Sequence, residues 1–276
     1  MSHTPLLCCP LDGLPLVLQN SQWCCANGHG FDVARQGYVN LLPVQNKRTL
    51  DPGDSKEMVV ARRDFLDGGW YQPIADKAVE LLKPYFKAGA VLLDAGCGEG
   101  YYLDHLAKAA GQDVYCVGND ISKHAIVAAC RRDKQHTWLV ASNKLLPVPP
   151  LSVDVLMCLF GFPVYAEFKR VLKDDGVMLL VDSAEQHMRE LREIIYPSIK
   201  EKQDRLVEQA SVAGFKLQNE VRITFPLHGL GKQQLYSLLL MTPHFFKAKA
   251  EGREKILKMD SFDLTADVWL RLFSKE

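Results

Sequence analysis

The chain has 276 residues, 47% of them hydrophobic and 24% charged, and its 33 basic residues balance 33 acidic ones. This length and composition are typical of an enzyme with one catalytic domain and a smaller attachment, and the balanced charge excludes a general attraction to nucleic acid. No apolar run is long enough to cross a bilayer and the first residues lack the features of a signal peptide, so we expect a cytoplasmic protein without membrane contacts.

The first 36 residues are rich in Cys, Gly and Pro and show no helical periodicity. Cys9 and Asp12 are three positions apart and Cys25 and His29 are four positions apart, which is the spacing of a zinc knuckle. Zinc prefers four N, S or O ligands in a tetrahedron, and a site with four protein ligands serves structure rather than catalysis. We therefore predict a zinc-binding module over residues 1–36.

Two alternatives stay open for this module. Cys8 or Cys24 could take the place of Asp12, although adjacent residues rarely both reach one ion, or the module could fold without metal. The other four cysteines stand singly in apolar segments and are expected to be buried as small hydrophobic residues. These are Cys97, Cys116, Cys130 and Cys158.

Residues 37–84 are predicted to form a connector with two helices. A polar stretch precedes Ser55, which can cap a helix that ends at Gly68 and Gly69, and a second helix is expected over residues 73–83. The apolar face of the first helix consists of Met58, Val59, Ala61 and Phe65.

From residue 85 onward, short apolar strands alternate with amphipathic helices. Repeated β-α units of this kind imply a parallel sheet with helices on both faces, so residues 85–276 are predicted to form an α/β domain with an open, Rossmann-like sheet. The expected strands cover 91–93, 114–117, 136–140, 153–159 and 177–181, and the expected helices 101–110, 123–132 and 164–172.

The last 90 residues give a less regular pattern. A long charged amphipathic helix is predicted after His187, and residues 221–225 are predicted to form a strand. From Thr265, charged and apolar residues interleave, which indicates a final antiparallel strand.

Three alternating glycines, Gly96, Gly98 and Gly100, separate the first strand of this domain from the next helix. Glycine is needed where the chain turns tightly or where backbone approaches a ligand closely. The spacing G-x-G-x-G differs from the G-x-G-x-x-G of a dinucleotide site, and no Lys or Ser/Thr follows as in a P-loop. A tight strand-to-helix turn without ligand is the alternative reading of these glycines alone.

Acidic residues accompany the glycines. Asp94 ends the first strand, Glu99 lies within the loop, and Asp120 ends the next strand. Glu99 would repel a pyrophosphate but suits a ligand with an ammonium and a sulfonium group, and Asp120 can accept hydrogen bonds from both ribose hydroxyls. We therefore predict that this loop binds S-adenosylmethionine.

Two further segments are expected at the ends of neighbouring strands. Ser142 follows the third strand, where adenine would lie, although it could equally be a turn residue. Phe160 and Phe162 follow the fourth strand, where open sheets bind their ligands. They could stack on a flat substrate, or pack in the core as aromatic residues near a sheet commonly do.

Beyond these local patterns, nearly the whole chain resembles the bacterial 23S ribosomal RNA (guanine-N1)-methyltransferases, which methylate a guanine in an RNA hairpin. The resemblance implies that Tyr71 and His187 help to enclose the cofactor beside Gly98 and Glu99. It also implies a homodimer with a shared RNA cleft. The motifs that carry it are residues 9–11, 28–32, 37–43, 51–58, 61–66, 94–102 and 241–243.

One position departs from the family pattern. The family has Cys-x-x-Cys at the start of the module, and this chain has Asp12 at the second cysteine. A carboxylate is a harder ligand than a thiolate, so we expect weaker zinc binding.

The chemistry that the resemblance implies is methyl transfer to guanine N1. This atom carries a weakly acidic proton on the Watson–Crick edge, so the base must be unpaired and the proton removed. Asp54, Glu99, His187 or solvent could accept the proton.

Basic residues of the module and connector would hold RNA phosphates, although a solvated face with mixed charge is the alternative. These residues are Arg35, Lys47, Arg48, Lys56, Arg62 and Arg63. Two other functions are consistent with the sequence, namely a small-molecule methyltransferase and a non-catalytic, RNA-binding factor in ribosome assembly.

Overall fold

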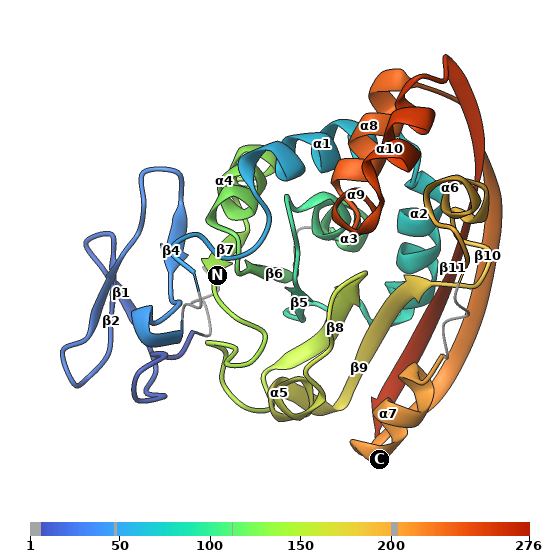
Figure 1. Cartoon of the computed structure of the whole chain (residues 1–276). Coiled ribbons are helices and arrows are strands. Elements are labelled where there is room, and N and C mark those ends of the chain that lie inside the picture. Colours follow the sequence, from blue (N-terminus) through green and yellow to red (C-terminus); the bar gives the residue numbers. More distant parts are fainter. Residues whose placement is uncertain (1–6, 47–48, 112, 200–203) are drawn as a thin grey trace.

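The computed structural model describes residues 7–46, 49–111, 113–199 and 204–276. Its main feature is an eight-stranded sheet with the order β10-β11-β9-β8-β5-β6-β7-β4 (Figure 1). The five predicted strands form the parallel centre of this sheet. They are β5 (Val91–Ala95), β6 (Tyr115–Asp120), β7 (Thr137–Val140), β8 (Val153–Leu159) and β9 (Leu172–Ser183).

The helices between these strands also agree with the sequence analysis. They are α3 (Tyr101–Ala110), α4 (Lys123–Arg132) and α5 (Tyr165–Val171). In the connector, α1 (Lys56–Asp67) begins after Ser55, whose hydroxyl accepts a hydrogen bond from the Met58 N–H. The helix α2 (Gln72–Leu82) follows, and the short 3-10 helix η2 (Lys83–Tyr85) leads into the sheet.

A long antiparallel hairpin completes one edge of the sheet. Its strands are β10 (Phe215–Gly231) and β11 (Ser261–Lys275), and β11 also pairs antiparallel with β9. The predicted final antiparallel strand is therefore confirmed. Between the two strands lie three helices that the sequence analysis did not identify. These are α8 (Lys232–Leu240), α9 (His244–Lys247) and α10 (Ala250–Leu257), which lie with α1 beyond the arrowheads of β8 and β9 (Figure 1).

The long helix predicted after His187 is wrong. The described residues contain two short helices there instead, α6 (Arg189–Ile195) and α7 (Leu206–Val212). Tyr196 ends α6 with an extended backbone (φ −118°, ψ 141°) and precedes Pro197. A residue before proline is pushed out of the helical region by the proline ring, which explains the early end of the helix.

The N-terminal module contains a three-stranded antiparallel sheet of β1 (Val17–Gln19), β2 (Gln22–Cys24) and β3 (Gly30–Asp32). The next strand, β4 (Tyr38–Asn40), pairs in parallel with β7 and is the edge of the main sheet. A 3-10 helix, η1 (Val44–Asn46), follows β4.

The module packs against the catalytic sheet rather than standing apart from it. Leu16 and Trp23 are buried in one hydrophobic cluster with Leu146 and Val148, and the Cys8 N–H donates to the Pro147 carbonyl at 2.9 Å. The apolar surface of the small module is therefore covered partly by its neighbour.

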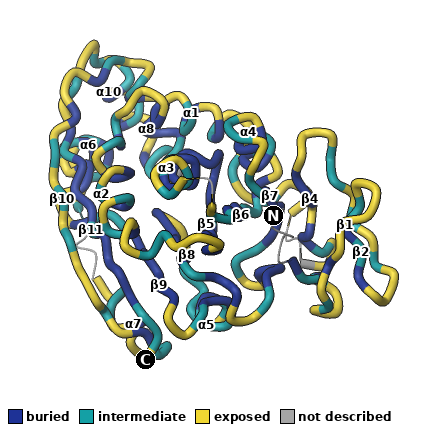
Figure 2. The backbone as a smooth tube through the Cα atoms, turned by 180° about the vertical axis from the view of Figure 1, so that it is seen from behind, coloured by how far each residue is buried: buried dark blue, intermediate teal, exposed yellow. Residues whose placement is uncertain are grey.

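The buried residues are concentrated in the centre of the main sheet. The central strands are buried along most of their length, whereas β10 is largely exposed (Figure 2). The four isolated cysteines are buried, as predicted. Among the residues that the structure describes, no helix is both long and apolar enough to cross a membrane.

Candidate functional site: the acidic glycine loop and the metal cluster

The glycine loop lies at the carboxyl end of β5, between β6 and β8. The strand order reverses direction here, and open α/β sheets bind their ligands at such a position. Gly96, Gly98 and Gly100 have positive φ values of 95°, 56° and 85°. A Cβ on Gly100 would lie only 2.7 Å from Cη2 of Trp138, so only glycine fits there.

The three predicted acids form one buried group around this loop. Asp94 and Glu99 are each 2% exposed. Burial raises the pKa of Asp94 well above its usual value, and the charges of Asp120 and Glu99 raise it further. Burial also raises the pKa of Asp120, although N–H groups of Ser122 and Gly98 bond its oxygens at 2.8 and 3.0 Å. A cationic ligand would relieve this repulsion, which fits S-adenosylmethionine.

Two asparagines also shape the loop, and the sequence analysis did not select either as a site residue. The Asn119 amide donates to Oδ1 of Asn143 at 2.9 Å, and the Asn143 amide donates to the Ala95 carbonyl at 3.2 Å. Ser142, which was expected near adenine, accepts a hydrogen bond from the Lys144 N–H at 3.2 Å. Asn119 directly precedes Asp120 in the chain, and that position is the signal that could have identified it.

Aromatic residues form a wall next to the loop. The Tyr71 ring lies 6.0 Å from the Phe160 ring and 6.1 Å from the His187 ring, measured between centroids. Phe160 follows β8 and has a positive φ of 54°, a conformation that is uncommon for non-glycine residues. Phe162, two residues on, is 90% exposed. The structure thus brings together the pair that the resemblance implied, Tyr71 and His187, with Phe160 beside both rings.

The hydrogen bonds of His187 fix its protonation. Its Nδ1 accepts the N–H of Asp267 at 3.1 Å, so the ring proton is on Nε2, which donates to the Tyr71 hydroxyl at 3.2 Å. Burial lowers the pKa of His187 to about 4. The ring is therefore neutral, and the hydroxyl hydrogen of Tyr71 is left available for another acceptor.

Strand β11 holds this histidine in position. Asp267 is fully buried and accepts two hydrogen bonds from Arg222, both at 2.8 Å, and one from the Gln186 N–H at 2.9 Å. The loop that carries His187 is thus bonded to β11 twice, through the Gln186 N–H and through the His187 ring, and both bonds go to Asp267. Sequence reasoning did not find Asp267 because its partners lie far away in the chain.

The three side chains named as proton acceptors are already engaged. Asp54 forms an ion pair with Arg62. Glu99 is paired with Arg132 at 3.1 Å, and both ring nitrogens of His187 are used as just described. This arrangement favours solvent as the acceptor of the N1 proton.

The four predicted metal ligands form a compact cluster in the N-terminal module. The ligand atoms of Cys9, Asp12, Cys25 and His29 all lie within 4.8 Å of one another. Nδ1 of His29 is 3.5 and 3.4 Å from the two sulfur atoms and 3.0 Å from Oδ2 of Asp12. These separations suit the corners of a tetrahedron with zinc–ligand bonds of about 2.0 to 2.3 Å. Asp12 rather than Cys8 or Cys24 completes the cluster.

The basic residues do not form one patch. Lys56 and Arg35 are exposed, and Arg63 is partly exposed and bonded to Asp64. Arg62, in contrast, lies against the glycine loop, with Nη1 3.6 Å from the position of a Cβ on Gly98. Lys47 and Arg48 lie outside the described residues.

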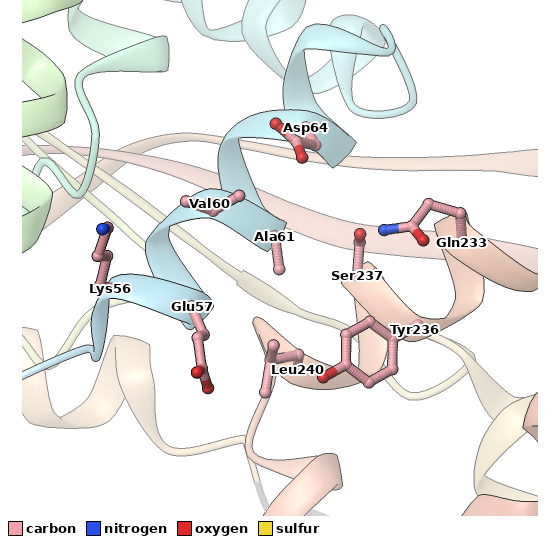
Figure 3. A pocket seen from close by; sticks show the side chains of 9 residues that line it. All are labelled: Lys56, Glu57, Val60, Ala61, Asp64, Gln233, Tyr236, Ser237 and Leu240. Carbon is pink, nitrogen blue, oxygen red and sulfur yellow. The ribbon is translucent and has the colours of Figure 1, made fainter.

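A groove of about 480 Å³ lies between α1 and α8, and Lys56 lines it together with the acidic Glu57 and Asp64 (Figure 3). Its walls combine the apolar Val60 with Tyr236, Ser237 and the aliphatic stem of Lys56. Both helices lie beyond the arrowheads of the central strands β8 and β9 (Figure 1).

The sheet order, the acidic glycine loop and the metal cluster define an S-adenosylmethionine-dependent methyltransferase with a zinc ribbon. A family model described as "Methyltransferase domain" matches residues 86–239, and one described as "RlmA, N-terminal", a zinc ribbon, matches residues 7–50. The first match covers the parallel strands and ends within α8, and the second extends from the metal cluster past β4.

Three curated proteins that are similar to this chain identify its family within the methyltransferases. A Bacillus subtilis protein provisionally named 23S rRNA (guanine-N1)-methyltransferase YxjB is 30% identical over 94% of both chains. A provisionally named 23S rRNA (guanine-N1)-methyltransferase of Micromonospora griseorubida is 34% identical over 68% of both. The 23S rRNA (guanine(748)-N1)-methyltransferase of Streptomyces fradiae is 32% identical over 66% of this chain and 65% of its own. The chain belongs to the 23S ribosomal RNA (guanine-N1)-methyltransferase family.

Proposed function

We propose that this protein transfers a methyl group from S-adenosylmethionine to N1 of a guanine in a hairpin loop of 23S ribosomal RNA, in the cytoplasm. The observation that carries the proposal is the relationship to the Bacillus subtilis protein over 94% of both chains, which includes the metal module as well as the methyltransferase domain. A small-molecule methyltransferase would not need the module.

The cofactor supplies an electrophilic methyl group, and the residues of the chain orient it. Asp120 suits the ribose hydroxyls, Asp94 and Glu99 suit the cationic end, and Tyr71 has a hydroxyl hydrogen free to donate. Ser142 and the three loop glycines complete the proposed cofactor site. The pKa of Tyr71 is raised by burial, so the phenol stays protonated and acts as a donor.

The target guanine must leave its helix, because N1 lies on the Watson–Crick edge. Phe162 and the half-exposed Phe160 stand at the carboxyl end of β8 next to the glycine loop. An unpaired base can stack on such rings, which contributes about 1 to 3 kcal/mol per base. The proposed site thus holds the purine ring close to the methyl group and lets water take the proton.

RNA phosphates would be held by basic residues at the surface, namely Arg35 from the module and Lys56 and Arg63 from the connector. Lys47 and Arg48 belong to the same proposal. The zinc ribbon, with Cys9, Asp12, Cys25 and His29 as ligands, would contact one side of the hairpin, and two copies of the chain would form a shared cleft. Sedimentation of the free protein and of its RNA complex tests the homodimer.

The direct test is to treat unmodified 23S RNA with the purified protein and labelled S-adenosylmethionine, then to digest it and analyse the nucleosides by mass spectrometry. We expect 1-methylguanosine at a single hairpin. Label on another guanine atom, on a small molecule or on a protein would contradict the proposal. RNA binding without methyl transfer would support an assembly factor instead.

A charge-reversal series tests the RNA contacts. The double variant Lys56→Glu, Arg63→Glu should weaken RNA binding and reduce the slope of log affinity against log salt by about 1 for each lost phosphate contact. Lys87→Glu is the matched control, because Lys87 is 66% exposed and precedes β5, at the opposite end of the strands. An equal loss of affinity in the control would show that only general charge is measured.

A further inference from the structure

The cofactor carries a carboxylate as well as two cationic groups, and the acidic loop does not suit that carboxylate. Asp94, Glu99 and Asp120 all lie at the site, where burial and then the charges of Asp120 and Glu99 raise the pKa of Asp94. A further anion would add to this repulsion unless a cation stood beside it. A methyltransferase with this loop therefore needs a positive group close to the glycines.

Burial raises the pKa of Glu99, and the charges of two nearby arginines, Arg132 and Arg62, offset part of this rise. Arg132 is already occupied. Its Nη2 donates to Glu99 at 3.1 Å and to Asp67 at 2.8 Å, and its Nε donates to the Glu99 carbonyl at 3.2 Å. Arg132 thus balances the charge of Glu99 and holds the loop from the α4 side.

Arg62 comes from α1 and faces the middle of the loop. Its Nη1 is 3.6 Å and its Cδ 3.7 Å from the position of a Cβ on Gly98, so no side chain separates the arginine from the backbone that the cofactor approaches. The side chain is 25% exposed. Although the sequence analysis grouped it with the RNA-binding residues, Arg62 does not share the exposed surface of Lys56.

Neighbouring segments hold the guanidinium group in place. Nη2 donates to the Met241 carbonyl at 3.2 Å, just after α8, and Nη1 pairs with the carboxylate of Asp54. Asp54 is itself fixed, because its carbonyl accepts the Ser122 hydroxyl at 2.7 Å. A guanidinium has five N–H donors. The bonds to Met241 and Asp54 hold the group at the loop and leave other N–H donors of Arg62 for a ligand.

We propose that Arg62 binds the α-carboxylate of S-adenosylmethionine and of the product S-adenosylhomocysteine. A planar guanidinium forms strong, directional hydrogen bonds with a carboxylate, and its positive charge offsets the acids around it. This assignment separates Arg62 from its neighbour Arg63, whose guanidinium group donates to Asp64.

The test compares two ligands by isothermal titration with the zinc-loaded full chain. Decarboxylated S-adenosylmethionine keeps the ammonium and the sulfonium and lacks only the carboxylate. Arg62→Ala should weaken binding of S-adenosylmethionine about 10- to 100-fold, the usual range for a hydrogen bond to a charged group, and leave the decarboxylated ligand nearly unchanged. Arg62→Lys should recover part of the loss, and Arg63→Ala should bind both ligands like the wild type.

Each other outcome overturns the assignment. If Arg62→Ala weakens both ligands equally, the arginine supports the loop through Asp54 and Met241 and does not bind the carboxylate. If neither ligand is affected and RNA binding falls instead, Arg62 contacts phosphate. A wild-type chain that binds neither ligand would refute the cofactor itself, which is a separate result.

Discussion

The glycine loop and the metal cluster are both built from a few residues close in the chain, but different forces shape them. The loop is set by backbone bonds of the sheet, since the N–H groups of Gly96 and Cys97 both donate to the Asn119 carbonyl, at 2.8 and 3.0 Å. The metal cluster joins four side chains in a module of three-residue strands. The loop therefore has a backbone framework of its own, whereas we expect the module to depend on its metal.

Metal removal should give the largest effect and separates the two regions most clearly. A structural zinc supplies about 10 to 16 kcal/mol of apparent binding free energy toward folding. We expect chelation, or the variant Cys25→Ser, to expose the amides of residues 7–33 to hydrogen exchange while β5 and β8 stay protected. Equal protection of the module with and without metal, read by mass spectrometry, would contradict its dependence on zinc.

The next largest effect concerns the loop. Gly98→Val adds a branched side chain at a positive φ facing Arg62, and Asp120→Ala removes an acceptor for the ribose and for the Gly98 N–H. Each variant should lose S-adenosylmethionine binding about 100-fold or more, the range of two or more lost interactions with a charged or polar ligand. The fold should remain, as judged by circular dichroism. Titration calorimetry showing near-native affinity in both would disprove the loop's role.

The aromatic wall should make stability depend on pH. The pKa of His187 is about 4 in the folded chain, against about 6.5 when exposed. Between these values the unfolded chain binds the extra proton, so stability falls as the pH drops from 6.5 toward 4, by on the order of 3 kcal/mol for this residue.

Urea unfolding at pH 7 and pH 5 measures this dependence. His187→Gln keeps a polar group but cannot titrate, so its free energy of unfolding should change less between the two values than that of the wild type. His228→Gln, at an exposed histidine, is the control and should keep the wild-type slope. An unchanged slope in His187→Gln would show that other groups cause the acid sensitivity.

The smallest effect is a gain of metal affinity. Asp12→Cys replaces a hard carboxylate by a thiolate, which zinc binds more strongly. We expect the affinity to rise about tenfold, measured by competition with a coloured chelator, and cofactor binding to stay the same. A lower affinity would mean that the module is shaped around the carboxylate, for which the bond from the Asn27 amide to Asp12 at 3.1 Å gives a reason.

Sequence reasoning succeeded where the signal is local. The central strands, the helices α3 and α4 and the glycine loop follow from periodicity and from residues a few positions apart. The clustering of Cys9, Asp12, Cys25 and His29 follows from their spacing. Tyr71 and His187 were found only through the family resemblance. They lie 116 positions apart in the chain, and no local pattern reports such a contact.

The missed features depend on tertiary contacts. The three helices between β10 and β11 were not identified, although α8 is almost entirely apolar along its second half, because a short apolar run has no clear period. Arg62 and Arg63 are identical in type and adjacent in sequence, so only the structure separates the one at the loop from the one facing Asp64.

Strand β4 follows the metal module directly and is also an edge strand of the catalytic sheet. It pairs with β7, which pairs with β6, the strand that ends in Asp120. Backbone hydrogen bonds therefore fix the separation between the zinc ribbon and the point of methyl transfer. An RNA hairpin that contacts both must match this separation. The protein would therefore select its substrate by the size and shape of the hairpin before any base is recognised.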